Sequence, residues 1–131
     1  LKAMRFAPVN DKAKTDYDAS DRIASLFIEL LERQFPIEHP NQTIQLRFPS
    51  EYANQLAVHV NHLNRALKEK TQKTTTTIIN ERLTQEAKIL LKHTDWNISQ
   101  IGYSLGFEEP TNFSKFFKTN TELSPSKFRS V

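Results

Sequence analysis

Cysteine is absent from this sequence of 131 residues, and glycine occurs only twice. Without cysteine, neither a disulfide framework nor a thiolate zinc site can form. Long apolar runs are missing too: none approaches the ~18 residues that indicate a membrane span, and the first ten residues show no signal-peptide pattern. We therefore expect a globular chain without a membrane segment. Because it begins with Leu1 rather than methionine, we also expect a fragment of a longer protein.

The usual patterns of catalytic and cofactor sites are missing as well. The sequence has no glycine-rich phosphate loop, no GxSxG and no cysteine nucleophile. His59 and His62 are spaced i, i+3, but no nearby carboxylate completes a metal-ligand set. Glu108 and Glu109 fall in an expected turn, whereas an acid–base pair needs a pocket. We therefore expect no enzymatic activity, no cofactor and no metal ion.

Charge is distributed unevenly along the chain. Residues 1–49 carry seven basic and seven acidic side chains, whereas residues 50–131 carry eleven and eight. The whole net charge of +3 therefore belongs to the second part. A basic excess of this kind suits a polyanionic partner, although an ordinary solvated surface would give the same count.

The first part of the chain shows one amphipathic helix. Ile23, Leu26, Phe27, Leu30 and Leu31 form an apolar stripe at helical spacing, which predicts a helix over about residues 18–35. Residues 1–17 are polar and mixed, and we expect them to be poorly ordered. Prolines 36, 40 and 49 then indicate a linker, in which residues 44–48 are a candidate extended stretch.

Residues 50–131 read as helical almost throughout. Ser50 is a candidate N-cap for a short helix, and Thr74 is one for a long helix over 75–93. Asn97 with Gln100 resembles a capping box, and Ser124 precedes a proline that suits the first turn of a last helix over 125–130. The long helix keeps an apolar face at Ile79, Leu83, Ala87, Leu90 and Leu91.

An internal repeat divides this second part. YANQLAV at 52–58 aligns with IGYSLGF at 101–107, and NHLNRALK at 61–68 aligns with TNFSKFFK at 111–118. The basic positions of the two copies coincide. The repeat therefore predicts two helix-turn-helix units, over 50–70 and 97–120, joined by the long helix.

The two glycines lie at matching points of this unit. Where the first helix of such a unit crosses the second, a small residue is needed, and Ala53 and Gly102 stand there. The turn that follows often needs a positive φ, which Gly106 supplies without steric cost and Ala57 supplies less comfortably. An ordinary αα-hairpin would explain the glycines alone, but it would not explain the matched basic residues.

The second unit and the last helix carry a set of residues at characteristic positions: Ile98, Ile101, Leu105, Gly106, Phe107, Phe113, Phe117, Lys118, Pro125 and Arg129. With these residues, the segment 50–129 resembles the DNA-binding domain of the AraC/XylS family of bacterial transcription regulators. Four positions depart from that family's pattern. Gln72 and Glu122 stand where glycine usually ends each recognition helix, His59 replaces a serine cap, and Gly102 replaces alanine.

This resemblance implies an all-α, homeodomain-like fold with two helix-turn-helix subdomains joined by a long connecting helix. It implies a cytoplasmic protein whose partners are double-stranded DNA and RNA polymerase. Residues 1–49 would be the tail of an effector-binding or dimerisation domain that is mostly missing, so an effector would act only through that domain. Recognition helices over 60–69 and 110–119 would enter successive major grooves, which recur every ~34 Å on one face of the duplex.

The predicted DNA contacts lie on matching faces of the two recognition helices. Arginine pairs well with guanine and asparagine with adenine in the major groove, so the first copy is expected to be the more discriminating reader. We expect base contacts from Asn61, Asn64, Arg65, Thr111, Ser114 and Lys115. We expect phosphate contacts from Lys68, Asn112, Lys118 and backbone N–H groups near Asn97. His62 could contact either bases or backbone.

Some alternatives stay open from the sequence. Arg82 could contact phosphate or pair with Glu86 one turn on, and we favour the pair. The helical spacing of the aromatic residues indicates a core rather than stacking platforms for single strands, and Trp96 is expected to plug one subdomain. The rival function is a protein-interaction or dimerisation module with only non-specific nucleic-acid affinity, which would use the Ile23–Leu31 stripe. RNA binding is a smaller alternative.

Overall fold

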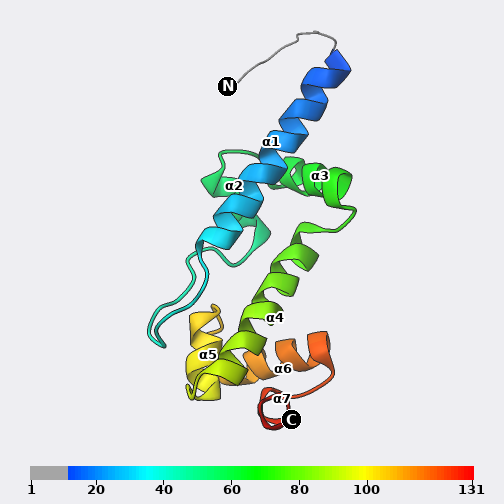
Figure 1. The fold of residues 1–131 in the computed structure, drawn as a ribbon. Helices are drawn as coiled ribbons and strands as arrows, with labels where there is room; N and C mark the ends of the chain where they lie inside the picture. The colour runs from blue at the N-terminus through cyan, green and yellow to red at the C-terminus, as the bar shows by residue number, and fades with distance from the viewer. Residues whose placement is uncertain (1–11) are drawn as a thin grey trace.

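The computed structural model describes residues 12–131, with side chains from residue 19 onward. Within that part the chain forms helices joined by turns and contains no strand, which confirms the all-α prediction. Figure 1 shows α4 running between two groups of helices, with α2 and α3 near its first end and α5, α6 and α7 near its last. The helices are α1 (Lys12–Arg33), α2 (Pro49–Gln55), α3 (Val60–Thr71), α4 (Thr75–His93), α5 (Ile98–Ser104), α6 (Pro110–Thr121) and α7 (Pro125–Ser130).

The first helix differs from its prediction at both ends. It begins at Lys12 rather than near residue 18, and it ends at Arg33 rather than Phe35. Lysine and alanine are good helix formers, and a helix extends easily once it is nucleated. The first helix therefore extends to residues before position 19, although they carry no apolar stripe. The expected disorder of residues 12–17 was therefore wrong, and residues 1–11 lie outside the described part. Residues 44–48, expected to be extended, form no strand.

The start of α2 was also predicted wrongly. Ser50 is not the N-cap: the helix begins at Pro49, and Phe48 precedes it in extended conformation. Proline suits the first helical position because its missing N–H would have no partner there. Glu51 completes this start, since its carboxylate accepts hydrogen bonds from the backbone N–H groups of Arg47 and Phe48 at 2.7 and 2.8 Å.

The other predicted helix starts are confirmed. The Thr74 hydroxyl accepts from the Thr77 N–H, and the Ser124 hydroxyl accepts from the Lys127 N–H. Asn97 and Gln100 form the expected capping box, with reciprocal bonds of 2.8 and 2.9 Å. The connecting helix spans Thr75–His93 as predicted, and its apolar face is buried.

The two helix-turn-helix units repeat each other in backbone detail. Helices α2 and α5 each have seven residues, and α3 and α6 each have twelve. In the first unit a hydrogen bond from the Val58 N–H to the Ala53 carbonyl closes the turn. In the second unit the Phe107 N–H donates to the Gly102 carbonyl in the same way. Ala57 has φ +59° and Gly106 has φ +91°. The expected positive φ is present in both copies.

The core joins α1 to the first unit and gathers aromatic rings in the second. Phe27 of α1 meets Tyr52 of α2 edge-on, with ring centroids 4.9 Å apart. Phe113 and Phe117 are fully buried, as predicted for core residues rather than stacking platforms. Trp96 is partly buried and packs against the core. Within residues 12–131, no helix is long and apolar enough to span a bilayer.

Gly102 is required by a close approach between α5 and α6. A Cβ added at Gly102 would lie 2.9 Å from the Phe113 Cβ and 3.1 Å from its Cγ. Because Phe113 is fully buried, its ring has little room to move aside. The small residue predicted at this crossing is therefore a steric requirement.

We predict that Gly102→Ala lowers the free energy of unfolding by about 1–3 kcal/mol, because overpacking outweighs the gain in helix propensity. Urea denaturation would measure it. Ser99→Ala, at an exposed position of the same helix, also gains helix propensity, though less, and meets no clash, so it should be neutral or stabilising. A Gly102→Ala protein as stable as Ser99→Ala would contradict the steric argument.

Tyr52 should make stability depend on pH in the alkaline range. Burial raises the pKa of its phenol to about 12, and the nearby Glu51 carboxylate adds to that effect. The folded state thus favours the neutral phenol, so its contribution is complete below pH ~10 and is lost as the pH rises towards 12. We expect about 2 kcal/mol of pH-dependent stability between pH 9 and 11.5, measured by denaturation. Tyr52→Phe should remove this component and Tyr103→Phe, at an exposed position, should keep it.

Candidate nucleic-acid interface

One face of α3 presents the polar side chains that were predicted to read DNA. Asn61, Asn64, Arg65 and Lys68 are all exposed, and His62 beside them is partly buried. The opposite face of the helix packs inward through Leu63, Ala66 and Leu67. The amphipathic pattern of α3 thus orients the polar face outward.

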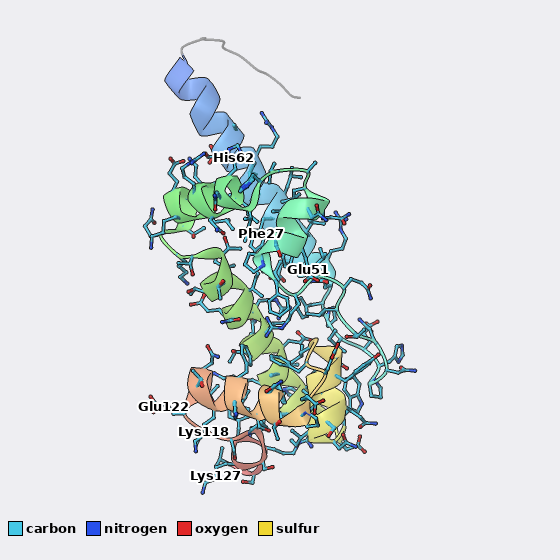
Figure 2. The ribbon with its side chains drawn as sticks, turned by 180° about the vertical axis from the view of Figure 1, so that it is seen from behind. Phe27, Glu51, His62, Lys118, Glu122 and Lys127 are labelled. Carbon is cyan, nitrogen blue, oxygen red and sulfur yellow. The ribbon has the colours of Figure 1, made fainter. Side chains whose placement is uncertain are left out.

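The matching face of α6 is presented in the same way. Thr111, Asn112, Lys115 and Lys118 are exposed, whereas Ser114 is partly buried. Phe113 and Phe117 anchor the helix from its other side. Figure 2 shows His62 on α3 and Lys118 on α6 at opposite ends of α4. The structure therefore places the two predicted sets on separate helices, carried at the two ends of α4.

The basic side chains of these faces have no acidic partner among the side chains from residue 19 onward. Among the side chains that the structure describes, no carboxylate forms an ion pair with Arg65, Lys68, Lys115 or Lys118. Lys68 reaches only the Gln72 carbonyl, at 3.4 Å. Unpaired cations attract a polyanion without first breaking an internal contact.

His59, which stands where the family pattern has a serine, caps the start of α3. The His59 Nδ1 accepts a hydrogen bond from the Asn61 N–H at 3.1 Å, so the imidazole acts where a serine would in the family pattern. This contact fixes the first turn of the helix and the backbone of Asn61. Position 59 therefore keeps its capping role despite the substitution.

Asn64 has an internal partner that the sequence did not reveal. Its Oδ1 accepts from the hydroxyl of Thr75, which is buried at the start of α4, at 2.7 Å. The side-chain NH₂ group stays available to donate. The bond ties the middle of the first recognition helix to the connecting helix.

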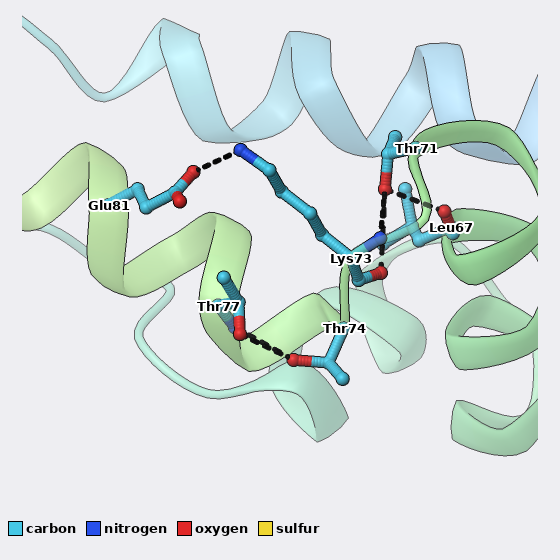
Figure 3. A network of polar contacts seen from close by, with 6 residues as sticks. All are labelled: Leu67, Thr71, Lys73, Thr74, Thr77 and Glu81. Carbon is cyan, nitrogen blue, oxygen red and sulfur yellow. Dashed lines mark hydrogen bonds and ion pairs between the residues drawn. The ribbon is translucent and has the colours of Figure 1, made fainter.

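A repeated threonine network ends each recognition helix and orients the next one. The Thr71 hydroxyl donates to the Leu67 carbonyl at 2.7 Å and accepts from the Lys73 N–H at 3.1 Å. Figure 3 shows this network beside the Thr74 cap and the Lys73–Glu81 ion pair. Thr121 repeats both contacts, with the Phe117 carbonyl and the Leu123 N–H. Thr71 and Thr121 were not among the predicted functional residues, although their equal positions in the two copies were a signal that could have found them.

The ends of the recognition helices keep the geometry that glycine usually provides. Gln72 has φ +60° and Glu122 has φ +71°, and the N–H of each bonds back to the helix, to Lys68 and Lys118 respectively. Both recognition helices therefore end in the left-handed conformation that glycine usually adopts, although neither ends in glycine. The cost is backbone strain, since left-handed conformation is unfavourable for a residue with a Cβ.

Arg82 does not face a DNA groove as a free cation. Its guanidinium bonds Glu86 of the same helix at 3.1 Å and Glu32 of α1 at 3.0 Å, and it lies 4.1 Å from the centre of the Phe35 ring. The favoured pairing with Glu86 is confirmed.

Near Asn97, the capping box occupies two of the backbone N–H groups expected to hold phosphate, those of Asn97 and Gln100.

The fold and these surfaces define a helix-turn-helix nucleic-acid-binding domain. A family model described as a helix-turn-helix domain matches residues 52–130. The chain belongs to this family, and specifically to its AraC-type DNA-binding domains, as the sequence signature predicted.

Two relatives and a solved structure are similar to this chain, and the solved structure shares its fold. The transcriptional activator RhaS of Escherichia coli O1:K1 is 31% identical over 77 residues, 59% of this chain and 28% of RhaS. A protein named histidine kinase P4, from Formosa agariphila, is 29% identical over 126 residues, 96% of this chain but 9% of that protein. A solved regulator from Chromobacterium violaceum, with an AraC-type DNA-binding domain, superposes with a TM-score of 0.64 at 21% identity, over 86% of this chain and 94% of its own. The chain thus spans a small part of both curated relatives.

The left-handed cap offers a test of the strain at the end of α6. We predict that Glu122→Gly raises the free energy of unfolding by about 0.5–1 kcal/mol, because glycine adopts this conformation without a Cβ penalty and a carboxylate leaves the negative end of the helix. Chemical denaturation would measure the gain. Glu69→Gly, within α3, should instead cost about 1 kcal/mol. Loss of stability in both variants would show that position 122 is not strained.

Proposed function

We propose that this domain binds double-stranded DNA sequence-specifically by placing α3 and α6 in successive major grooves. The observation that carries the proposal is an exposed polar face with cations that pair with no carboxylate among the described side chains, presented once at each end of α4. A protein-interaction module would have no reason to repeat that face.

The length of the connecting helix supports this arrangement. Nineteen residues at ~1.5 Å each make α4 about 28 Å long. Successive major grooves on one face of the duplex recur every ~34 Å. Recognition helices attached at the two ends of α4 can therefore reach grooves that are one helical turn apart.

The first unit is proposed as the stronger reader. Asn61 and Arg65 are exposed one turn apart, and they suit adenine and guanine respectively. Asn64 would contribute chiefly as a donor, because its oxygen already accepts from Thr75. His62 lies on the flank and would contact base or backbone. Lys68 would hold a phosphate, which positions α3 without specifying sequence.

The second unit offers shorter and less selective side chains. Thr111, Ser114 and Lys115 would face the bases, with Asn112 and Lys118 on the phosphates. Glu108 and Glu109 are exposed immediately before α6, where they would repel the DNA backbone. The corresponding positions before α3 are Val58 and His59, and neither carries an acidic side chain. We therefore expect α6 to add affinity and spacing more than base discrimination.

The wider roles are proposals about a longer protein. We propose transcription regulation in the cytoplasm, with RNA polymerase as a further partner. An effector would be bound by a domain that residues 1–131 do not include. The resemblance to an activator and to part of a histidine kinase supports a DNA-reading module that different sensory parts can control.

Selection of sites from random duplex DNA tests the proposed function. Two conserved blocks about one helical turn apart are the expected result, with binding that weakens steeply as salt increases. One block would mean that only one unit reads bases. No enrichment would favour the protein-interaction alternative, and weaker competition by duplex DNA than by RNA would favour RNA binding.

Arg65→Ala should weaken binding to the selected site by about 1–3 kcal/mol and relax the base preference within one block. Titration of labelled duplexes would measure both effects. Arg33→Ala is the matched control, because Arg33 is exposed on α1 and pairs with Glu29 there. Equal losses in the two variants, with the preference intact, would show that Arg65 contributes only charge.

A further inference from the structure

We propose that residues 34–48, here called the strap, are a positioning element that fixes the two helix-turn-helix units relative to each other, with Arg47 as its central residue. The strap would thereby set the spacing between the two blocks of DNA that the domain reads. The DNA part of this inference rests on the proposed function, whereas the positioning part does not.

The strap first attaches to the middle of the connecting helix. The Ile37 N–H donates to the Glu86 Oε2 at 2.8 Å, and the Glu86 side chain is almost completely buried. Arg82 pairs with the other oxygen of Glu86 and lies over the Phe35 ring. A buried carboxylate with partners on both sides is costly to expose, so this attachment resists separation.

The strap next attaches to α5 of the second unit. The Ile44 N–H donates to the Ser104 carbonyl at 3.0 Å, and the Thr43 hydroxyl donates to the Tyr103 carbonyl at 2.8 Å. The Ser104 hydroxyl donates to the Pro40 carbonyl at 3.2 Å. The loop in Figure 1 that descends from α1 and passes beside α5 is this part of the strap.

The strap then returns to the first unit. Gln34 holds both ends together, since its Oε1 accepts from the Gln45 and Leu46 N–H groups at 2.8 and 2.7 Å. Its Nε2 donates to the Tyr52 hydroxyl at 2.8 Å, and that hydroxyl donates to the Leu46 carbonyl at 3.0 Å. The end of α1, the strap and α2 therefore form one hydrogen-bonded group.

Arg47 connects the end of the strap to the second unit. Its guanidinium carbon lies 4.8 Å from the centre of the Phe48 ring, which precedes α2, and 4.5 Å from that of Phe107, in the turn of the second unit. Phe116 of α6 is 5.7 Å away. Arginine is suited to such stacking because its guanidinium is planar and delocalised.

Arg47 is partly buried at this contact, and the inner part of its side chain is shielded from solvent. Its Nε is inaccessible and has no hydrogen-bond partner among the described residues, and desolvation lowers the pKa of its guanidinium. Its Cδ would lie 3.1 Å from a Cβ added at Gly106. Gly106 therefore serves two needs, the positive φ of its turn and the close approach of this arginine.

If α4 were the only connection between the two units, their relative orientation would be less restricted than it is in this structure. Short turns follow α3 and α4, and small changes in their dihedral angles would swing each unit about an end of α4. A second connection between the units, besides α4, restricts this swinging. The gain in affinity from two linked binding units depends on how they are placed relative to each other. The strap is such a connection, because it contacts α2, α4, α5 and the turn before α6.

Spin labelling tests the positioning role without DNA. Because the chain has no cysteine, Glu69→Cys and Thr119→Cys place one label on each recognition helix, both at exposed positions. In the protein that carries only these two labels, we expect a narrow distribution of the distance between them. After Arg47→Ala the distribution should become broader or shift, with helix content retained. Arg33→Ala should leave the distribution unchanged. An unchanged distribution after Arg47→Ala would overturn the proposal, whatever DNA binding shows.

Should Arg47→Ala fail to fold, Thr43→Val with Ser104→Ala removes two side-chain hydrogen bonds between the strap and α5 and tests the same claim by the same distances. A distribution as narrow as that of the parent protein would again overturn it.

The DNA part is tested with selected duplexes in which the second block is moved in single base-pair steps. The unsubstituted protein should show a sharp optimum, and Arg47→Ala should reduce the preference for that optimum by about tenfold while binding to the first block alone is kept. A preserved optimum would overturn the role in spacing. If the unsubstituted protein selects no DNA at all, the proposed function fails, while the distance measurement still decides the role of the strap.

Discussion

The close crossing of two helices within each unit is the constraint on which this structure depends. In the second unit α5 and α6 approach so closely that Gly102 has no room for a Cβ against Phe113. The turn must then reverse within few residues, which places Gly106 and Ala57 in left-handed conformation. Alanine does this at a cost of about 1 kcal/mol. The crossing sets which face of each recognition helix is buried and so which face is presented outward.

The repeat made much of this predictable from the sequence. Both units, the connecting helix over 75–93, three N-caps and the exposure of most predicted contact residues follow from local spacing and capping chemistry. Contacts between distant segments were not predictable in this way. The bond between Asn64 and Thr75 and the place of Arg47 among three aromatic rings join residues whose spacing carries no signal. The helix before residue 18 was missed because it lacks an apolar stripe.

Residues 19–48 pack against the helix-turn-helix units. Phe27 packs on Tyr52, and Ile37 and Ile44 are buried in the shared core. That this segment is also the tail of another domain stays a prediction. Arg82, for which the sequence also allowed a phosphate contact, forms an ion pair with Glu32 of α1. The similarity to the Formosa agariphila protein covers 96% of the chain, so it extends well into this N-terminal segment. Helix α1 and the strap thus act structurally with the helix-turn-helix units.

Hydroxyl-radical footprinting on a selected duplex tests the central claim most directly, that two recognition helices read successive major grooves. The account predicts two protected regions on one face of the duplex, separated by ~10 base pairs. A single protected region, or two regions on opposite faces, would contradict it.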